Sequence, residues 1–526
     1  MPVLPQTGTG QQMTDSTPQS TGPMLAADGT TLKSSLNRAL RRQKIRALML
    51  IAPLLLFILL TFIMPIGEML FRSVENDIVP NTLPRTVVAL QDYDPDSNEA
   101  PSEDVFAAFY VDLFIAEDFK NHTRLGSRLN YESSGISSLF RSTGRAIGKF
   151  DTDVYTKQFG AADADLSDPA KWVDWMADPA IRAALPETAS AYAGWADMVV
   201  NSQGKDPAAR KLDDFVYTAL YRDLAAGRSA PGFPAVDVSG FETVSIRDQF
   251  ADAEGKWLDP EVWRTVKAYS GAYTNGYFLN SIDMMKSSDG PVARPDNERI
   301  YIKLFLRTIW MSLVITGSCI LLGYPVAWLL ANLPLRSANV LMILVLLPFW
   351  TSLLVRTSAW KILLQQQGVI NDVLVWLGVV GDDSRLALIN NMTGTIIAMT
   401  HILLPFMILP LYSVMKTIPP SYLRAAKSLG ATNWTAFWRV YFPQSVPGIG
   451  AGSILVFILA IGYYITPELV GGTKGVFISN RIAFHISSSL NWGLAAALGA
   501  ILLVLVLGLY WLYDKIVGID NVKLGG

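Results

Sequence analysis

Six long stretches of apolar residues run through this chain, each bounded by polar, proline or glycine positions. They cover residues 47–67, 304–330, 338–354, 393–414, 449–465 and 494–512. A helix of about 20 consecutive apolar residues crosses ~30 Å of hydrocarbon, so stretches of this length are typical of membrane spans. The pattern therefore predicts an all-α, polytopic membrane protein with six transmembrane helices.

The first apolar stretch has a second interpretation, as the apolar part of a signal peptide. Its length, its distance from the N-terminus and the sequence Pro65–Ile66–Gly67–Glu68, where a small-residue cleavage site would lie, favour a membrane span. A basic cluster precedes it: Lys33, Arg38, Arg41, Arg42, Lys44 and Arg46. Because Lys and Arg gather beside spans on the cytoplasmic side, we expect a cytoplasmic N-terminus.

A polar segment, residues 75–299, separates the first two spans and is here called the insert. It contains five tryptophans suited to a water-soluble core: Trp172, Trp175, Trp195, Trp257 and Trp263. Helical periodicity at 171–185 and 213–226 predicts a mainly helical globular fold. The chain would then have five parts: a disordered, basic tail (1–46), a first transmembrane helix (47–74), the insert (75–299), a core with five transmembrane helices (300–515) and a cytoplasmic tail (516–526).

Charge separates the insert from the remainder of the chain. Residues 75–298 hold 36 of the 45 acidic residues against 21 Lys and Arg, a net charge of −15, whereas the other residues carry a net +13. Because cytoplasmic loops are enriched in Lys and Arg, this partition favours a periplasmic insert. Six crossings would place both termini in the cytoplasm. The acidic surface is either simply solvated or a docking surface for a partner or cations.

A polar segment between the fourth and fifth spans, residues 416–448, has an unusually regular pattern; it is here called the hairpin. Pro419 and Pro420 favour a helix start, with Ser421 as a candidate N-cap. Gly430 suits the left-handed residue that ends such a helix. With four basic and no acidic residues, the hairpin is expected in the cytoplasm.

A second short amphipathic helix is expected in the hairpin from about Asn433. Its apolar face would consist of Trp434, Phe437, Trp438 and Tyr441. Pro443 and Pro447 are expected to stop this helix before the next apolar stretch. An ordered loop between two spans indicates a docking surface for another protein.

The residues contain no catalytic or metal-binding pattern. There is no phosphate-binding Gly-Lys-Ser/Thr loop, and three histidines and one cysteine show no metal-ligand spacing. The chain is therefore expected to be no enzyme, with no cofactor and no metal site, and Cys319 is expected to be a packing residue. His401, within a span, is either functional or hydrogen-bonded to a neighbouring helix.

The hairpin sequence RAAKSLGATNWTAFWRVYFPQSVPGI, residues 424–449, resembles the EAA loop of type I ABC importer permeases. The matching positions are Ala425, Ala426, Gly430, Ala431, Phe437 and Pro443. Four further segments resemble the spermidine/putrescine permeases: LGYPVAWLLANLP (322–334), LPFWTSLLVRTSAWKILLQQQGVIN (347–371), LPLYSVMKTIPPSYLRAA (409–426) and ITPELVGG (465–472).

This resemblance implies the type I ABC importer permease fold in a bacterial inner membrane, with polyamine-like solutes. The partners implied are a pair of ATP-binding subunits, a second permease subunit, usually a different chain, a periplasmic solute-binding protein and the lipid bilayer, but no nucleic acid. ATP hydrolysis would occur in the separate ATPase, and the helix at 421–429 would transmit its motion. Other solutes for the same machinery are an opine, an amino-acid derivative or a ferric ion.

The sequence departs from the family pattern at three places. Arg424 occupies the position of the motif's Glu, which indicates either a co-adapted partner or a solvated position. Tyr463 and Tyr464 stand where relatives often carry Gly, an acid and an aromatic residue. The insert is also far longer than the family's usual segment between these spans. A membrane-anchored sensor or scaffold built on the insert is the remaining alternative, although it would not need the hairpin.

Five residues are candidates for the substrate pathway, namely Trp350, Arg356, Tyr463, Tyr464 and Glu468. Glu468 lies at the outer end of the fifth span, is the one acidic residue near that end, and could meet a cationic solute. Tyrosine rings can hold an ammonium group by cation–π contact. Each has a plainer interpretation, because Arg356, like Lys361, can snorkel to headgroups and aromatic residues anchor spans at the interface.

Overall fold

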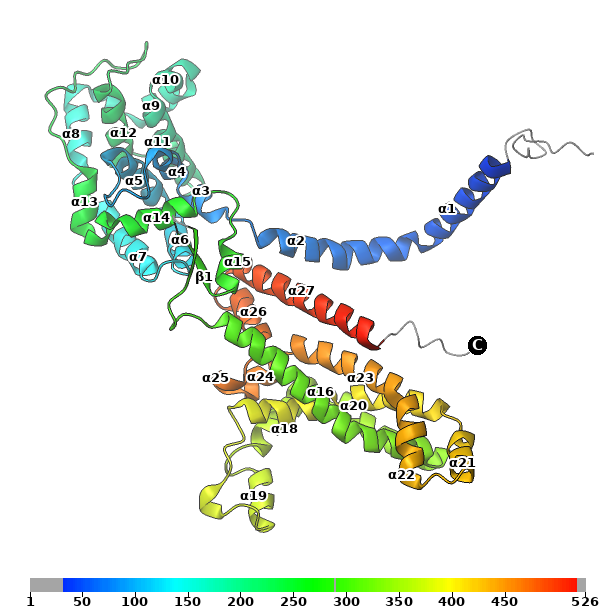
Figure 1. Cartoon of the computed structure of the whole chain (residues 1–526). Helices are drawn as coiled ribbons and strands as arrows, with labels where there is room; N and C mark the ends of the chain where they lie inside the picture. The colour runs from blue at the N-terminus through cyan, green and yellow to red at the C-terminus, as the bar shows by residue number, and fades with distance from the viewer. Residues whose placement is uncertain (1–31, 288–289, 518–526) are drawn as a thin grey trace, which may run out of the picture. The chain divides into compact units, whose positions relative to one another are not determined.

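The computed structural model describes residues 32–287 and 290–517, which are mainly helical, as predicted (Figure 1). The chain divides into two compact units, Met1–Met69 and Leu70–Gly526. Strands in the described residues are limited to one antiparallel hairpin of β1 (Met284–Ser287) and β2 (Gly290–Ala293).

The first unit contains the first predicted span. α1 (Leu32–Ile58) continues through a π-helical turn, η1 (Leu59–Ile63), into α2 (Met64–Arg72). Residues Gln43–Arg72 are long and apolar enough to cross a membrane, and none of their side chains in the apolar window is buried. The helix is therefore longer than the predicted 47–67, and it continues through Pro65, which directly follows the π-helical turn.

The insert is a helical body with one aromatic-rich core. Its α-helices are α3 (Ile78–Thr82), α4 (Pro84–Ala89), α5 (Glu103–Asp118), α6 (Asn121–Leu129), α7 (Ile136–Ala146), α8 (Asp153–Ala162), α9 (Pro169–Ala177), α10 (Pro179–Ala184), α11 (Pro186–Asp197), α12 (Asp214–Ala225), α13 (Ile246–Ala253), α14 (Pro260–Ala268) and α15 (Gly276–Ser281). Trp172, Trp195, Trp257 and Trp263 are fully buried in this core. Asp side chains cap several of the short helices, for example Asp168, Asp178 and Asp259.

The helices after the insert include the other predicted spans and the short helices that connect them. They are α16 (Tyr301–Asn332), α17 (Leu335–Leu346), α18 (Leu353–Leu363), α19 (Val369–Trp376), α20 (Met392–Thr417), α21 (Pro420–Ser428), α22 (Asn433–Ala436), α23 (Phe442–Gly462), α24 (Ile465–Val470), α25 (Gly472–Gly475), α26 (Ile478–Ser487) and α27 (Trp492–Val517). α16, α20 and α23 pack together around buried Met311, Met407 and Val456. Cys319 is buried there, as expected, with its Sγ 3.5 Å from the carbonyl oxygen of Thr400.

The third predicted span is bent rather than straight. α17 runs through a 3₁₀ turn, η8 (Leu347–Trp350), and the chain then turns by 94° into α18. Pro348 lacks a backbone donor and Ser352 caps α18 by accepting from the Val355 amide (3.2 Å), so one helix ends and another begins here. The described residues hold five helices that could cross a membrane, and six if this pair crosses as one span.

The fifth span begins earlier than predicted. The expectation that Pro443 and Pro447 stop the hairpin's second helix is wrong, because residues Asn433–Gly462 form one continuous helical stretch. A π-helical turn, η10 (Phe437–Tyr441), precedes Pro443 and shifts the backbone hydrogen-bond register there. Pro443 then lies in the first turn of α23, where its missing N–H is tolerated.

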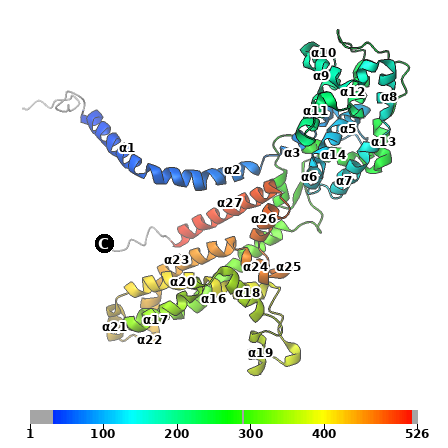
Figure 2. The ribbon, with the colours of Figure 1, turned by 180° about the vertical axis from the view of Figure 1, so that it is seen from behind.

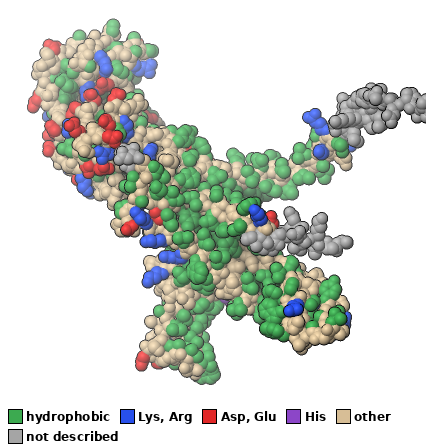
Figure 3. Space-filling model, viewed as in Figure 1, with side chains coloured by type: hydrophobic (Ala, Val, Ile, Leu, Met, Phe, Trp, Pro, Cys, Tyr) green, Lys and Arg blue, Asp and Glu red, His purple; other side chains and the backbone are tan. Residues whose placement is uncertain are grey.

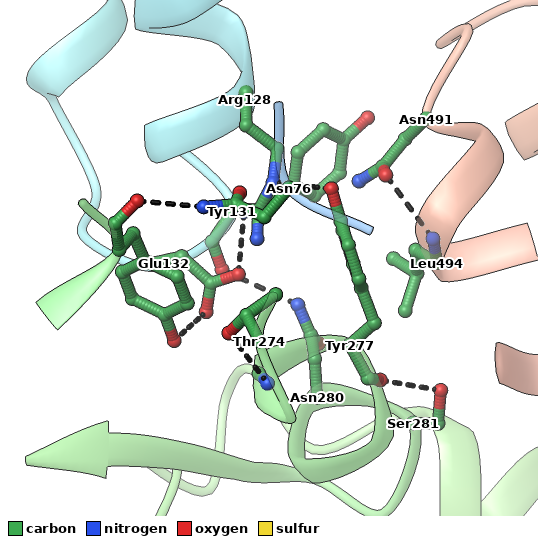
Figure 4. A network of polar contacts seen from close by, with 12 residues as sticks. Asn76, Arg128, Tyr131, Glu132, Thr274, Tyr277, Asn280, Ser281, Asn491 and Leu494 are labelled. Carbon is green, nitrogen blue, oxygen red and sulfur yellow. Dashed lines mark hydrogen bonds and ion pairs between the residues drawn. The ribbon is translucent and has the colours of Figure 1, made fainter. Parts of the chain in front are cut away.

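The insert joins the spans through a buried polar network (Figure 4). Arg128 of α6 donates to the Tyr277 hydroxyl of α15 (2.8 Å) and pairs with Glu132 (2.6 Å). Tyr277 also packs on the start of α27, where a Cβ at Gly493 would lie 2.4 Å from its ring. Both ribbon views place the insert at one end of α16 and the hairpin at the other (Figure 2).

Candidate functional site

The first helix of the hairpin, α21, starts one residue earlier than its predicted cap. Pro420 is the first helical residue and Pro419 the N-cap, so Ser421 lies inside the first turn, and its prediction as N-cap is wrong. The reason is that Pro420 has the backbone torsion of a helix start already fixed by its ring. The Tyr422 amide donates to the Pro419 carbonyl at 3.1 Å.

The end of α21 is closed as predicted. Gly430 has a left-handed φ of 89°. Its amide donates to the carbonyl of Lys427 (3.0 Å), and the Ala431 amide donates to that of Ala426 (3.1 Å). These two bonds are the Schellman arrangement, which satisfies carbonyls that a helix end would otherwise leave unpaired. The turn between α21 and α22 is therefore defined by its own hydrogen bonds.

The second helix of the hairpin starts at Asn433, as predicted. The Thr432 side chain caps it by accepting from the Thr435 amide at 3.2 Å. Its four aromatic residues divide into two pairs. Phe437 and Tyr441 turn inward, and Phe437 makes an edge contact with Tyr324 of α16 (6.2 Å between ring centroids). Trp434 and Trp438 are exposed.

Two polar contacts fix the hairpin to the spans. The Lys416 ammonium donates to the Ala331 carbonyl near the end of α16 (3.2 Å), and the Tyr324 hydroxyl lies 2.9 Å from the Ser445 hydroxyl. The outer surface of the hairpin is different, because its apolar side chains are not covered by other parts of this chain. Leu429 is 89% exposed and Trp434 71% exposed.

The candidate contact residues of the hairpin lie mostly on that outer surface. Arg424, Ala425, Gly430 and Pro443 are exposed, while Ala426, Ala431 and Phe437 are partly buried. Arg424 projects from the middle of α21, and its carbonyl accepts from the Ser428 hydroxyl (3.0 Å). The arrangement offers a rigid helix–turn–helix with an apolar and basic surface to another molecule.

The second group of candidates lies at the other end of the spans, where α18 packs on α24. The Thr357 and Thr466 hydroxyls are 3.1 Å apart and fully buried, which fixes the two helices to each other. Arg356, on the same turn of α18, is close enough to Tyr463 and His401 for electrostatic interaction. Its Nε is buried and has no hydrogen-bond partner within the chain.

His401 is held by α18, which agrees with the hydrogen-bonded alternative. The Trp360 indole donates to His401 Nδ1 at 3.1 Å, and the rings meet edge to face at 5.2 Å between centroids. A hydrogen bond received at Nδ1 leaves the proton of a neutral imidazole on Nε2.

Glu468 and the two tyrosines are held together by α26. Asn480 donates from one amide nitrogen to Glu468 Oε2 (2.6 Å) and to the Tyr464 carbonyl (2.9 Å). The Ser479 hydroxyl donates to the Tyr463 carbonyl at 2.6 Å. Tyr464 and Glu468 remain exposed, so they are oriented but not covered within this chain.

The structure thus groups four of the five pathway candidates, Arg356, Tyr463, Tyr464 and Glu468. Trp350 stands apart as the last residue of η8, just before the bend, and is 75% exposed. Sequence reasoning missed Asn480 and Ser479, which hold Glu468 and the two tyrosines, and Trp360, which holds His401. A single signal existed for Asn480, because an amide three residues after Phe477 is a common helix-start pattern, and its Oδ1 accepts from the Phe477 amide (2.9 Å).

Within residues 32–287 and 290–517, no three His, Cys, Asp or Glu side chains come together as a metal site would require. The two groups of candidates thus differ in character: polar and aromatic side chains lie at one end of the spans, and the hairpin with its exposed Leu429 and Trp434 lies at the other.

Comparisons with known proteins agree with this arrangement. Residues 303–517 match the family described as binding-protein-dependent transport system inner membrane component, which leaves the insert outside the match. The spermidine/putrescine transport system permease protein PotB of Salmonella typhimurium (strain SL1344) is 38% identical over 216 residues, 40% of this chain and 74% of that protein. PotB of Haemophilus influenzae is 34% identical over 233 residues, 43% of this chain and 81% of that protein.

Among solved structures, a chain of a bacterial alginate ABC transporter, crystallised with an alginate-bound periplasmic protein, is similar over 43% of this chain and 81% of that one. It is 19% identical, with a TM-score of 0.36.

Proposed function

Because this chain belongs to the family of binding-protein-dependent transport system inner membrane components, and is thus a permease subunit of an ABC importer, we propose that it forms the path for a small, polyamine-like organic solute. The PotB relatives, named for spermidine and putrescine, support this solute class. The family consists of transport proteins rather than enzymes, and we place ATP hydrolysis in a separate subunit.

The observation that carries the proposal is the hairpin. α21 ends in a hydrogen-bonded Schellman turn, and its outer surface exposes Leu429 and Trp434. Exposed apolar side chains on an ordered, polar loop are typical of a protein interface. We assign this surface to the ATP-binding subunit, with Arg424, Ala425, Ala426, Gly430, Ala431, Phe437 and Pro443 forming or supporting the contact.

The rigid construction of the hairpin suits the transmission of motion. Its inner side is fixed to α16 by Tyr324 and Lys416, so a push on α21 moves the spans rather than deforming the turn. Closure of the ATPase pair would bring the hairpins of two permease subunits together and open the path between them toward the other side, a rigid-body transition between two packed states. We propose a second, different permease chain as the partner across that path.

The orientation follows from the same assignment. With the hairpin in the cytoplasm, the insert and the Glu468 cluster lie on the periplasmic side, where a solute-binding protein would deliver its cargo. Both termini are then cytoplasmic. The net charges of −15 for residues 75–298 and +13 for the remainder support this direction.

Glu468, Tyr463 and Tyr464 are the residues we assign to a cationic solute. Asn480 holds both the Glu468 carboxylate and the Tyr464 carbonyl. A tyrosine ring can hold an ammonium group by cation–π contact, and we assign Tyr463 and Tyr464 to this role. Arg356 supports a second candidate, an amino-acid derivative or opine, because its buried and unpaired Nε would suit a carboxylate on the solute.

The test is uptake of labelled spermidine and putrescine by cells that lack this chain. The wild-type chain should restore uptake, and Gly430→Pro should not, because proline cannot adopt a φ of 89°. The variant's amount in the membrane serves as control. Normal uptake with Gly430→Pro would remove the assigned role of the hairpin.

The solute assignment has its own experiment. Glu468→Gln should reduce uptake at limiting solute and leave it nearly unchanged at saturation if the carboxylate contributes to binding. Unchanged uptake at limiting solute would refute the Glu468 assignment. Calorimetry on the binding protein from the same gene cluster, with polyamines and with amino-acid derivatives, separates the two candidates.

A further inference from the structure

The insert-side end of α16 carries basic residues on one face. Lys303 and Arg307 are four residues apart, so they lie one above the other on the helix surface. Arg307 donates to the Thr473 carbonyl of α25 at 3.0 Å, and Lys474 is the next residue of α25. Lys303 and Lys474 are exposed and Arg307 is partly so.

The same face of α16 continues as an exposed apolar stripe. At 100° per residue, Leu306, Trp310, Leu313 and Leu321 lie on the side of Lys303 and Arg307, and all four are exposed, Trp310 by 60%. Gly317 lies within this stripe, with no atom within 4 Å of where a Cβ would be. The opposite face, with Met311, Ile315 and Cys319, is buried against α20 and α23.

The acidic residues closest in sequence are already engaged. Asp296 pairs with Arg299 (2.9 Å) and Glu298 with Arg294 (3.2 Å). Glu468, the acid nearest in sequence to Lys474, accepts from Asn480. The three basic groups therefore keep a local positive charge beside an insert whose residues 75–298 carry a net charge of −15.

The enrichment of Lys and Arg on the cytoplasmic side of membrane proteins does not account for this cluster. Lys and Arg gather on one side of a membrane protein, and in this chain the N-terminal cluster and the hairpin already hold that role. Figure 3 shows Lys and Arg side chains gathered where α16 begins, between the insert and the hydrophobic surface of the spans. Basic side chains at the start of α16, between the insert and the apolar spans, are suited to binding an anion at the membrane surface.

We propose that Lys303, Arg307 and Lys474 bind the phosphate of an anionic phospholipid whose acyl chain lies along Leu306, Trp310 and Leu321. Along the helix axis, the basic residues at the insert-side end are followed by an apolar stripe. This order matches a lipid that has an anionic head group at one end and an acyl chain behind it. Trp310 lies two helical turns below Lys303, at the level where an indole favours the membrane interface. Arg307 uses one N–H on Thr473 and keeps others for phosphate oxygens. The open position at Gly317 gives the acyl chain room.

The experiment uses the full chain purified with its partner subunits. Retained lipid is measured by native mass spectrometry after exchange into phosphatidylglycerol or phosphatidylcholine with identical acyl chains. The wild-type protein should retain phosphatidylglycerol with about tenfold or greater preference, since each basic residue near the surface attracts anionic lipid. Lys303→Gln with Lys474→Gln should abolish the preference and leaves the Arg307–Thr473 bond intact.

The matched control is Lys205→Gln with Lys211→Gln, the same change of charge on exposed residues of the insert, and it should retain the preference. The proposal is overturned by a wild-type protein without preference, by a Lys303/Lys474 variant that keeps it, or by equal loss in the control. Displacement of the lipid by soluble glycerol phosphate would also overturn it, because the site would then bind a free phosphate without the stripe.

Discussion

The tryptophans of the insert and those of the spans differ in what surrounds them. In the insert, Trp172, Trp195, Trp257 and Trp263 are fully buried. In the remainder, eight tryptophans are exposed: Trp310, Trp328, Trp350, Trp376, Trp434, Trp438, Trp492 and Trp511. The insert buries these four indoles in its core, whereas the remainder carries most of its indoles on the surface.

Hydrogen bonding shows the same difference. Each buried indole of the insert donates to a partner within the chain: Trp172 to Leu166 O, Trp195 to Asp213 Oδ2, Trp257 to Thr143 Oγ1 and Trp263 to Trp257 O. Buried donors must be paired within the fold because no solvent reaches them. The four indoles are thus fully accommodated inside the insert, whereas the permease part leaves eight indoles on its surface.

The largest expected difference in stability comes from replacing one tryptophan in each region by alanine. Trp257 packs on Phe109 (4.7 Å) and Phe140 (5.3 Å) and is 0% exposed, so Trp257→Ala should cost about 3–5 kcal/mol of insert stability. Trp376 is 82% exposed, and Trp376→Ala should cost less than about 0.5 kcal/mol. Protease sensitivity of the full chain in denaturant checks both, with cleavage followed in the insert for Trp257→Ala and around α19 for Trp376→Ala.

Equal sensitivity in the two variants would show that the contrast between the regions is wrong. Trp257→Phe, which keeps most of the ring packing but loses the bond to Thr143, should fall between them. That intermediate value separates the contribution of the hydrogen bond from that of the aromatic volume.

The junction between the two regions gives the second prediction, a dependence on pH. His485 of α26 is buried between Tyr301 (3.0 Å) and Ser489 (2.8 Å). Burial, together with the positive charge of Arg481, lowers the pKa of His485 to about 4. Below its ordinary pKa of about 6.5 the unfolded chain gains a proton that the folded chain does not, so stability falls as the pH falls.

Between pH 6.5 and pH 5 this loss should amount to about 2 kcal/mol. Thermal unfolding of the full chain at both pH values, for wild type and His485→Gln, measures it. Gln keeps a donor and an acceptor without titrating, so its pH dependence should be weaker by that amount. An unchanged pH dependence would mean that His485 is not kept neutral at this junction.

The two regions also differ in how much of their structure can be predicted from the sequence. Apolar runs predict the spans well, because a helix of that length and composition has few alternatives in a bilayer. Prolines are less reliable guides: Pro443 is the second residue of α23 after a π turn instead of ending a helix, and the third span, with Pro348 in η8, bends by 94° before α18. Both outcomes depend on hydrogen-bond register, which composition does not reveal.

The candidate site was predictable to different degrees at its two ends. Gly430 follows from local turn chemistry and was found. The pairing of Glu468 with Asn480 requires α24 and α26 to meet, and the contact of Trp360 with His401 joins residues 41 positions apart. No local pattern carries such pairings, so sequence reasoning found Glu468 without the residue that orients it.

A third prediction compares two glycines with left-handed backbones, Gly430 in the hairpin (φ 89°) and Gly204 in the insert (φ 62°). Neither has an atom within 4 Å of a Cβ position, so alanine fits and the cost is backbone strain of about 1–2 kcal/mol at each. Only Gly430→Ala should reduce solute uptake, because only the hairpin is assigned to the ATPase. Uptake assays at equal membrane content measure this, and equal reductions would contradict the assigned division of labour.

The smallest effect is expected at Arg424, where the family motif has Glu. Arg424 is exposed on α21, so Arg424→Glu should change stability by less than about 0.5 kcal/mol. A glutamate there would even gain a favourable i,i+3 neighbour in Lys427, worth about 0.2–0.5 kcal/mol. If the position is solvated in the assembled importer, uptake should stay within about twofold of wild type. A loss of uptake that is restored by an opposite charge change in the ATPase would instead show a direct contact, and would place a charge pair on a surface whose other exposed contacts, Leu429 and Trp434, are apolar.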